Sequence, residues 1–162
     1  METNDSGEKI KGLDEFVSWV EKFCEESHIP NIKYNEDDEA PMKLEYGEII
    51  SLSSEECFAQ AMILMNYASY LQKKLDTLDS HLSWCDEAMN YLFSHEWDNY
   101  TGKFTPKEIV KKSIIKGNSY AQELEKCRIR LSSGVRLISE QCKDVKKRVS
   151  LLQDLGKKRS FS

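Results

Sequence analysis

The sequence predicts an all-α protein: a long antiparallel helical hairpin with coiled-coil heptads, plus a small helix near the N-terminus. Two observations support this prediction. Two apolar series repeat with alternating gaps of three and four residues, the spacing of helices that pack as coiled coils. Glycine and proline number only 7 and 3 in 162 residues. So few turn-forming residues exclude an all-β chain with many tight turns.

The N-terminal segment, residues 1–53, is acidic and is expected to contain one amphipathic helix. Pro30 follows this helix, and the polar run 35–41 predicts an exposed loop or linker. Residues 44–52 fit either a short strand or an extended approach to the next helix. The helix itself is expected over about residues 12–27, where apolar residues recur at helical spacing: Leu13, Phe16, Val17, Val20, Phe23 and Cys24.

The first long helix of the hairpin is expected over residues 54–97. Ser53 and Glu56 have the spacing of a capping box, which marks a helix start. No glycine or proline interrupts the apolar series that follows, so the pattern favours one continuous coiled-coil helix. The members of this first heptad series are Cys57, Ala61, Leu64, Ala68, Leu71, Leu75, Leu78, Leu82, Cys85, Met89 and Leu92.

The second long helix is expected over residues 106–156, after an aromatic-rich loop at 98–105. Thr105 and Glu108 have capping-box spacing, with proline at the first helical position. Gly117 to Ser119 is a weak point where the helix can kink or break, and Gly156 is expected to be the C-cap. The second heptad series consists of Ile114, Gly117, Ala121, Leu124, Arg128, Leu131, Val135, Ile138, Cys142, Val145, Val149 and Leu152.

A second apolar stripe lies beside the first heptad series and predicts a further packing partner. An exposed stripe of this kind would be an apolar patch of the sort that soluble monomers avoid. Either the N-terminal helix or another subunit must therefore cover it, and we favour a homo-oligomer. The stripe contains Ile63 and the expected interface residues Tyr70, Trp84 and Tyr91.

Charge is distributed unevenly along the chain. Residues 1–60 carry 5 lysines against 16 acidic residues, and residues 61–100 carry 2 lysines against 6. Residues 101–162 carry 16 lysines and arginines against 6 acidic residues, a net charge of +10. Such an asymmetry favours a polyanionic partner for the basic half, although a solvated surface with internal charge pairing gives the same pattern.

Aromatic residues are interleaved with the first cluster of basic residues. This combination suits single-stranded nucleic acid, because ammonium and guanidinium groups neutralise phosphates while bases stack on rings. Arg128 is also the charged member of the second heptad series, where a polar residue usually sets register or oligomer order. It either pairs with an acid in the heptad series of a neighbour, lines a central channel, or extends to solvent. The candidate nucleic-acid-binding residues are Lys103, Lys107, Lys111, Lys112, Lys116, Arg128, Arg130, Trp97 and Tyr100.

Nothing in the sequence indicates an enzyme, a cofactor or a metal site. The phosphate-binding, dinucleotide-binding and nucleophile-elbow glycine motifs are missing. His81 and Cys85 share one helix face, but a metal site needs more ligands, and Cys85 belongs to the apolar series. The five cysteines form no CxxC pair. No apolar run is long enough for a membrane span, and no signal peptide is apparent, so we expect a cytoplasmic protein without a membrane partner.

The layout over about residues 55–160 resembles the UvsY-type recombination mediator proteins of T-even-like phages. The resemblance lies in a long heptad helix, a Tyr-x-Gly-Lys element at residues 100–103, and a second helix rich in lysine and arginine. It implies a small helical oligomer that binds single-stranded DNA and helps to load a recombinase onto strands coated by single-strand-binding protein. If the chain is phage-encoded, its compartment is the host cytoplasm. Of the basic residues, only Lys103 lies in the matching motif.

Two other functions remain open at the level of sequence. The first is a structural or adaptor coiled coil, for example in phage assembly, which binds no nucleic acid. The second is a regulator that presents its acidic N-terminal arm to a basic partner. The net charge of residues 101–162 favours the nucleic-acid-binding function over both.

Overall fold

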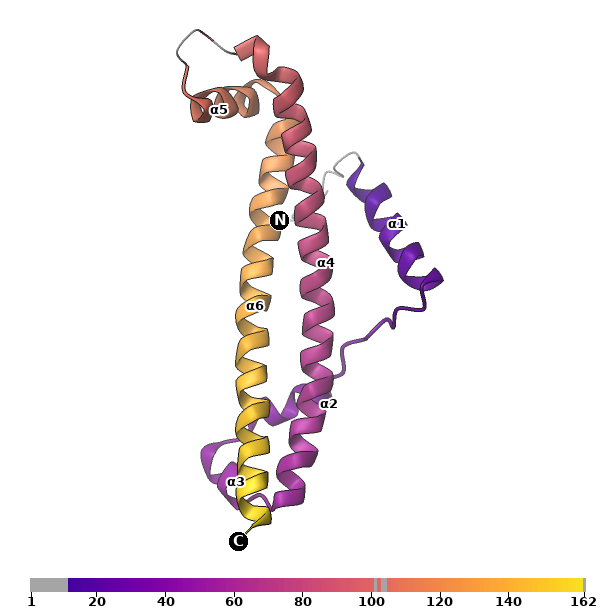
Figure 1. Ribbon diagram of the computed structural model, residues 1–162, viewed down its shortest axis with the longest axis vertical. Coiled ribbons are helices and arrows are strands. Elements are labelled where there is room, and N and C mark those ends of the chain that lie inside the picture. Colours follow the sequence, from indigo (N-terminus) through magenta and orange to yellow (C-terminus); the bar gives the residue numbers. More distant parts are fainter. Residues whose placement is uncertain (1–11, 101, 103–104, 162) are drawn as a thin grey trace, which may run out of the picture. The chain divides into compact units, whose positions relative to one another are not determined.

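The computed structural model describes residues 12–100, 102 and 105–161, and within these ranges the regular secondary structure is helical throughout. The prediction of an all-α protein is confirmed for these residues. In chain order the elements are α1 Leu13–Glu26, α2 Glu36–Glu39, the short 3₁₀ helix η1 Ala40–Lys43, α3 Tyr46–Ser51, α4 Ser54–Tyr100, α5 Lys107–Gly117 and α6 Ser119–Ser160 (Figure 1).

The chain divides into two compact units. Unit 1 combines Met1–Pro30 with Leu78–Ser133, and unit 2 combines Asn31–Thr77 with Gly134–Ser162. Within each unit, a part of α4 packs against a part of α6 (Figure 1). Each unit therefore joins a piece of the first 53 residues to pieces of both long helices.

The core of unit 2 lies between α4 and α6 and is built from the two heptad series. Leu64, Val145 and Leu152 are fully buried there, together with Ala61, Leu71 and Cys142. Gly156 lies inside α6, because this helix continues to Ser160, so the expectation that Gly156 is a C-cap is wrong. Its role is close packing: a Cβ at this position would lie 3.1 Å from the Phe58 ring and 3.3 Å from Cys57 Cβ.

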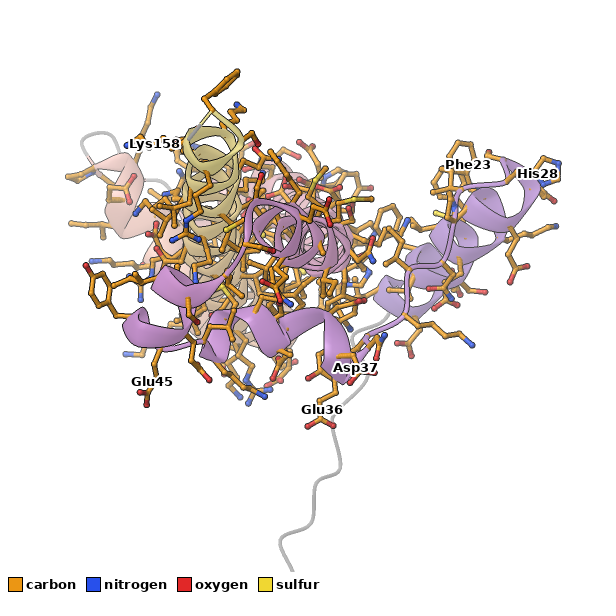
Figure 2. All side chains as sticks on the ribbon, turned by 90° about the horizontal axis from the view of Figure 1, so that it is seen from below. Phe23, His28, Glu36, Asp37, Glu45 and Lys158 are labelled. Carbon is orange, nitrogen blue, oxygen red and sulfur yellow. The ribbon has the colours of Figure 1, made fainter. Side chains whose placement is uncertain are left out.

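Between residues 36 and 51 the chain forms three short helices that belong to unit 2, which the sequence did not predict. The acidic run expected to be a loop contains α2, capped by the Asn35 side chain, which accepts a hydrogen bond from the Asp37 amide at 3.2 Å. Residues 46–51 form α3 rather than a strand or an extended segment, and Ile49 joins the core. Figure 2 shows Glu36 and Glu45 pointing outward, so their charges remain in solvent.

The core of unit 1 holds the second half of the first heptad series. Cys85, Met89, Ala121 and Leu124 are buried, and the aromatic ring of Trp84 packs against them from the side. Every member of the first heptad series is buried or half-buried, so its 3–4 spacing identified the packed face of α4 correctly.

Within unit 1, helix α1 contacts α4 through an aromatic stack, although none of the α1 residues is fully buried. Phe16 lies over Trp84 with ring centroids 6.3 Å apart, and Gly12 begins the helix with a left-handed φ of 92°. A Cβ on Gly12 would lie 3.0 Å from the Trp84 ring. Glycine suits this position for two reasons. It adopts a left-handed φ without strain, and it lets the Trp84 ring lie close to the backbone.

The end of α4 and the start of α5 differ in detail from expectation. Helix α4 continues past Trp97 to Tyr100, and α5 begins at Lys107 with Pro106 as its N-cap residue. The capping box at Thr105 and Glu108 is not formed. The Thr105 hydroxyl instead accepts a hydrogen bond from the Gly102 amide at 3.0 Å.

The predicted weak point in the second long helix is a complete break. Helix α5 ends at Gly117, and α6 begins one residue after Asn118, whose backbone is extended. The Asn118 side-chain oxygen accepts a hydrogen bond from the Ala121 amide at 3.1 Å and so caps the new helix. The single helix expected over 106–156 is therefore two helices. None of the helices described is both long enough and apolar enough to cross a membrane.

Candidate nucleic-acid interface

Helix α5 presents three lysines to solvent in unit 1. Its buried face consists of Val110 and Ile114, both fully buried. Lys112 and Lys116 are four residues apart and lie on the opposite, exposed face, while Lys107 is exposed at the start of the helix. Among the described residues, none pairs with the ammonium groups of these three lysines. Helix α5 therefore carries three positive charges that its surroundings do not neutralise.

Lys111 is placed differently, because its side chain lies over an aromatic ring of α4. Its Nζ is 5.6 Å from the centroid of the Phe93 ring, in the range of a cation–π contact. It also lies 3.9 Å from a carboxylate oxygen of Glu108, whose side chain is largely exposed. The ammonium group is thus half-buried and partly committed to contacts within unit 1.

The two candidate stacking residues lie at the C-terminal end of α4, and both are half-buried. The Tyr100 ring lies over Gly117, where a Cβ would be 3.2 Å from Tyr100 Cζ and would overlap the hydroxyl oxygen. Because Gly117 has no side chain, the Tyr100 ring can occupy this position. Trp97 is one turn earlier on the same helix, so the rings and the α5 lysines belong to the same end of unit 1 (Figure 1).

The Arg128 guanidinium is held by two acidic residues. Its Nε and Nη2 donate hydrogen bonds to the Glu125 carboxylate at 2.8 and 3.0 Å, and Nη1 lies 3.8 Å from Asp86 on α4. The hydrogen bond from Arg128 holds the pKa of Glu125 below its ordinary value. Arg128 therefore links α6 to α4, through acids that lie outside the two heptad series. Arg130 is exposed, and none of the described residues pairs with it.

Lys103 lies outside the described residues, so the structure says nothing of its position. Four of the basic residues of unit 2 are committed to contacts within the chain. Lys143 and Lys147 pair with acids one turn earlier, at 2.6 Å to Glu140 and 3.5 Å to Asp144. Arg148 and Arg159 instead hold the N-terminal segment. The guanidinium groups of Arg148 and Arg159 are therefore already hydrogen-bonded within unit 2.

The two arginines donate to main-chain carbonyl groups at the ends of the short helices. Arg148 Nη2 donates to the Leu44 oxygen at 2.6 Å and lies 3.4 Å from the Pro41 oxygen. Arg159 donates to the oxygens of Ile50 and Leu52. These contacts join residues more than one hundred positions apart, so helical spacing gives no signal for them.

The apolar stripe predicted as an oligomer interface is covered in part by the chain itself. Tyr70 packs against Tyr34, with ring centroids 5.5 Å apart, in unit 2. Trp84 is covered by α1 through Phe16 in unit 1. Tyr91 remains 66% exposed and lies beside His95, with ring centroids 4.1 Å apart. Of the three tyrosine and tryptophan side chains, Tyr91 is thus the one that offers a large surface to a second copy.

Comparisons with protein-family models, with curated proteins and with solved structures give no match to this chain. Membership of the recombination-mediator family, which the Tyr-x-Gly-Lys element suggests, therefore stays a prediction. In the described ranges, no group of three or more histidine, cysteine, aspartate or glutamate residues is arranged to hold a metal ion.

Proposed function

We propose that the protein binds single-stranded DNA and acts as an oligomeric accessory protein in recombination, helping to load a recombinase onto strands coated by single-strand-binding protein. The observation that carries the nucleic-acid part is the set of unpaired lysines on α5, at the end of unit 1 that also holds Trp97 and Tyr100. The recombinase and the single-strand-binding protein enter through the family resemblance. The cytoplasm, or the host cytoplasm for a phage protein, is the compartment in which this role would be performed.

The contrast between paired and unpaired lysines supports α5 as the phosphate-binding element. A lysine already bound to a carboxylate must break that contact before it neutralises a phosphate, whereas Lys107, Lys112 and Lys116 have no such contact to lose. Each phosphate neutralised on a single strand releases counterions and lowers the slope of log K against log salt by about 0.7. Three lysines on one short helix would therefore contribute about two units of slope.

We also propose that α4 and α6 form an antiparallel coiled-coil hairpin that assembles into a homo-oligomer through Tyr91. Within unit 2, the start of α4 contacts the end of α6 at Ser54 and Gly156, which supports an antiparallel arrangement. Light scattering should give a mass above the 18.8 kDa of one chain. Tyr91→Glu should lower that mass, because it places a charge in the proposed interface. A mass of one chain at micromolar concentration would contradict the oligomer.

Binding is tested by fluorescence polarisation with a labelled single strand and with labelled duplex at several salt concentrations. The informative variant replaces Lys107, Lys112 and Lys116 with glutamine. A matched control replaces Lys126, Lys143 and Lys147, which are ion-paired, so both variants lose three positive charges. The first variant should flatten the salt slope by about two units and the control by much less. Equal slopes in the two variants would exclude α5 as the interface.

A structural or adaptor role is the second candidate, and an open apolar groove in unit 2 favours it. Met62 and Met65 on α4 are 68% and 51% exposed, large values for apolar side chains. A groove of about 400 Å³ lies between Met65 and Gln72 of α4 and Val149 of α6. Of the two methionines, Met65 lines this groove, and a methionine side chain adapts to different partner helices. Failure of the full chain to bind single strands at low salt would make this the better account.

A further inference from the structure

Two cysteine thiols from different helices lie close together in unit 1. The Cys85 thiol of α4 donates a weak hydrogen bond to the Cys127 sulfur of α6, and the two sulfur atoms are 3.9 Å apart. Both are free thiols. Cys85 has no exposed surface, while Cys127 is half-buried. A small reagent in solvent can therefore reach Cys127. The buried Cys85 thiol can react with Cys127, which lies beside it.

The surroundings of the pair keep the two helices close. Ala121 and Leu124 of α6 are buried in one cluster with Cys85 of α4, so the two helices are packed together at this point. A disulfide bond is about 2.0 Å long, so the sulfurs must approach by about a further 2 Å. Because the Cys85 thiol already donates to the Cys127 sulfur, rotation about χ1 of each cysteine and a small helix shift are the movements that closure requires.

We propose that Cys85 and Cys127 are an oxidation site that forms an intramolecular disulfide with a low-molecular-weight disulfide, such as oxidised glutathione, as the oxidant. This inference is independent of the proposed nucleic-acid-binding function. It gives the thiol pair a redox role of the transient kind that occurs in cytosolic proteins.

The reaction is two successive thiol–disulfide exchanges. The Cys127 thiolate attacks one sulfur of oxidised glutathione, a mixed disulfide forms, and one reduced glutathione leaves. The Cys85 thiolate then attacks the Cys127 sulfur of that mixed disulfide and displaces the second glutathione. Two protein thiols lose two electrons and two protons in total, and one oxidised glutathione becomes two reduced molecules.

Burial makes the second exchange slow near neutral pH. Burial raises the pKa of the Cys85 thiol to about 12, with smaller contributions from Cys127 and Asp86, so little of it is thiolate. The attacking group is the thiolate, so the rate of closure should rise with pH while the mixed disulfide accumulates first. The finished bond would close a long loop between α4 and α6 and would raise the thermal midpoint of the oxidised protein.

The test incubates the folded full chain with oxidised glutathione, traps free thiols by alkylation and locates the linkages by peptide mass spectrometry. The expected product joins Cys85 to Cys127, and the chain loses two hydrogen atoms. In Cys85→Ala the same treatment should leave glutathione on Cys127, because no second thiol displaces it. Cys24→Ser should still form the crosslink, which controls for the third cysteine of unit 1.

Two results would overturn the proposal. One is a native chain in which Cys127 still keeps glutathione at equilibrium as fully as it does in Cys85→Ala. The other is a native chain in which neither thiol reacts at equilibrium with oxidised glutathione. Circular dichroism checks that Cys85→Ala is folded. If it is not, the peptide map of the native chain decides, since it needs no variant.

Discussion

The Arg159 guanidinium donates a hydrogen bond to the main-chain oxygen of Ile50 over 2.8 Å, and the same side chain also binds the Leu52 oxygen. Ile50 lies in the last turn of α3, where carbonyl groups have no partner within the helix. A cation at this end also meets the negative end of the helix dipole. Arg159 lies in the basic segment 101–162, but its side chain caps α3, a helix near the N-terminus.

Loss of this cap should destabilise unit 2. Arg159→Ala removes charge-assisted hydrogen bonds to several carbonyl oxygens, and we expect the free energy of unfolding to fall by about 1–3 kcal/mol. Lys157→Ala is the matched control, because Lys157 is exposed in the same helical turn and none of the described residues pairs with it. Urea unfolding followed by circular dichroism measures both. Equal losses in the two variants would mean that the capping contacts contribute little.

Two glycines of unit 2 should respond differently to substitution by alanine. A Cβ at Gly47 in α3 has no neighbour within 4 Å, whereas at Gly156 it would crowd Phe58 and Cys57. Alanine favours a helix over glycine by up to about 1 kcal/mol, so Gly47→Ala should stabilise the protein. Gly156→Ala should lose that gain through crowding, and Gly156→Val should destabilise by about 1–3 kcal/mol.

Thermal and urea unfolding of the three variants measure these differences. The Gly47→Ala result controls for helix propensity, so the difference between the two alanine variants isolates the crowding at Gly156. A Gly156→Val variant as stable as the unsubstituted chain would show that α4 and α6 are not packed closely at this point.

Acidification should weaken the contact of α1 with α4. His81 lies beside the Phe16 ring, with centroids 6.4 Å apart, and burial lowers its pKa although Glu21 opposes the shift. The unfolded chain then binds the proton more readily, with a pKa of about 6.5. The stabilisation is complete above that pH and is lost as the pH falls through it toward the lower pKa of the folded state.

Urea unfolding at a series of pH values from about 7.5 down to 5.5, the range in which histidine titrates, measures this loss. His81→Gln cannot titrate, so it should remove part of the pH dependence. A pH dependence that is identical in the two proteins would mean that His81 is equally accessible to protons in the folded and unfolded states.

The amino-acid sequence alone predicted the structural features that depend on local residue patterns. The 3–4 spacing identified the packed face of α4, and the members of the second series that lie in α6 are buried or half-buried, but Gly117 of the same series is exposed. Gly117 with Asn118 located the break between α5 and α6. Capping at Ser53 and Glu56 was also predicted correctly: the Ser53 amide donates to the Glu56 carboxylate at 2.7 Å, and the Glu56 amide donates to the Ser53 hydroxyl at 3.2 Å. These features arise from contacts within a few residues, which spacing in the sequence reports.

The features that the sequence missed depend on contacts between distant residues. Helix α3 is too short to be stable alone, and it exists because Ile49 enters the core and Arg159 caps its end. Gly156 has the appearance of a helix terminator, but its function is to admit Phe58. For the candidate interface, charge counting selected Arg128 and the α5 lysines alike, because it cannot tell a lysine in solvent from an arginine bound to Glu125 and Asp86.

Substitution of Trp97 should weaken single-strand binding without changing its salt dependence. Stacking of a base on a ring contributes about 1–3 kcal/mol and releases no counterions. Trp97→Ala should therefore lower the affinity for a labelled single strand at every salt concentration by a similar factor, while Trp97→Phe keeps a ring and should lose less. Trp19→Ala is the control, since Trp19 is 61% exposed in the same unit but lies on α1. A changed slope, or an equal loss in Trp19→Ala, would exclude Trp97 as a stacking platform.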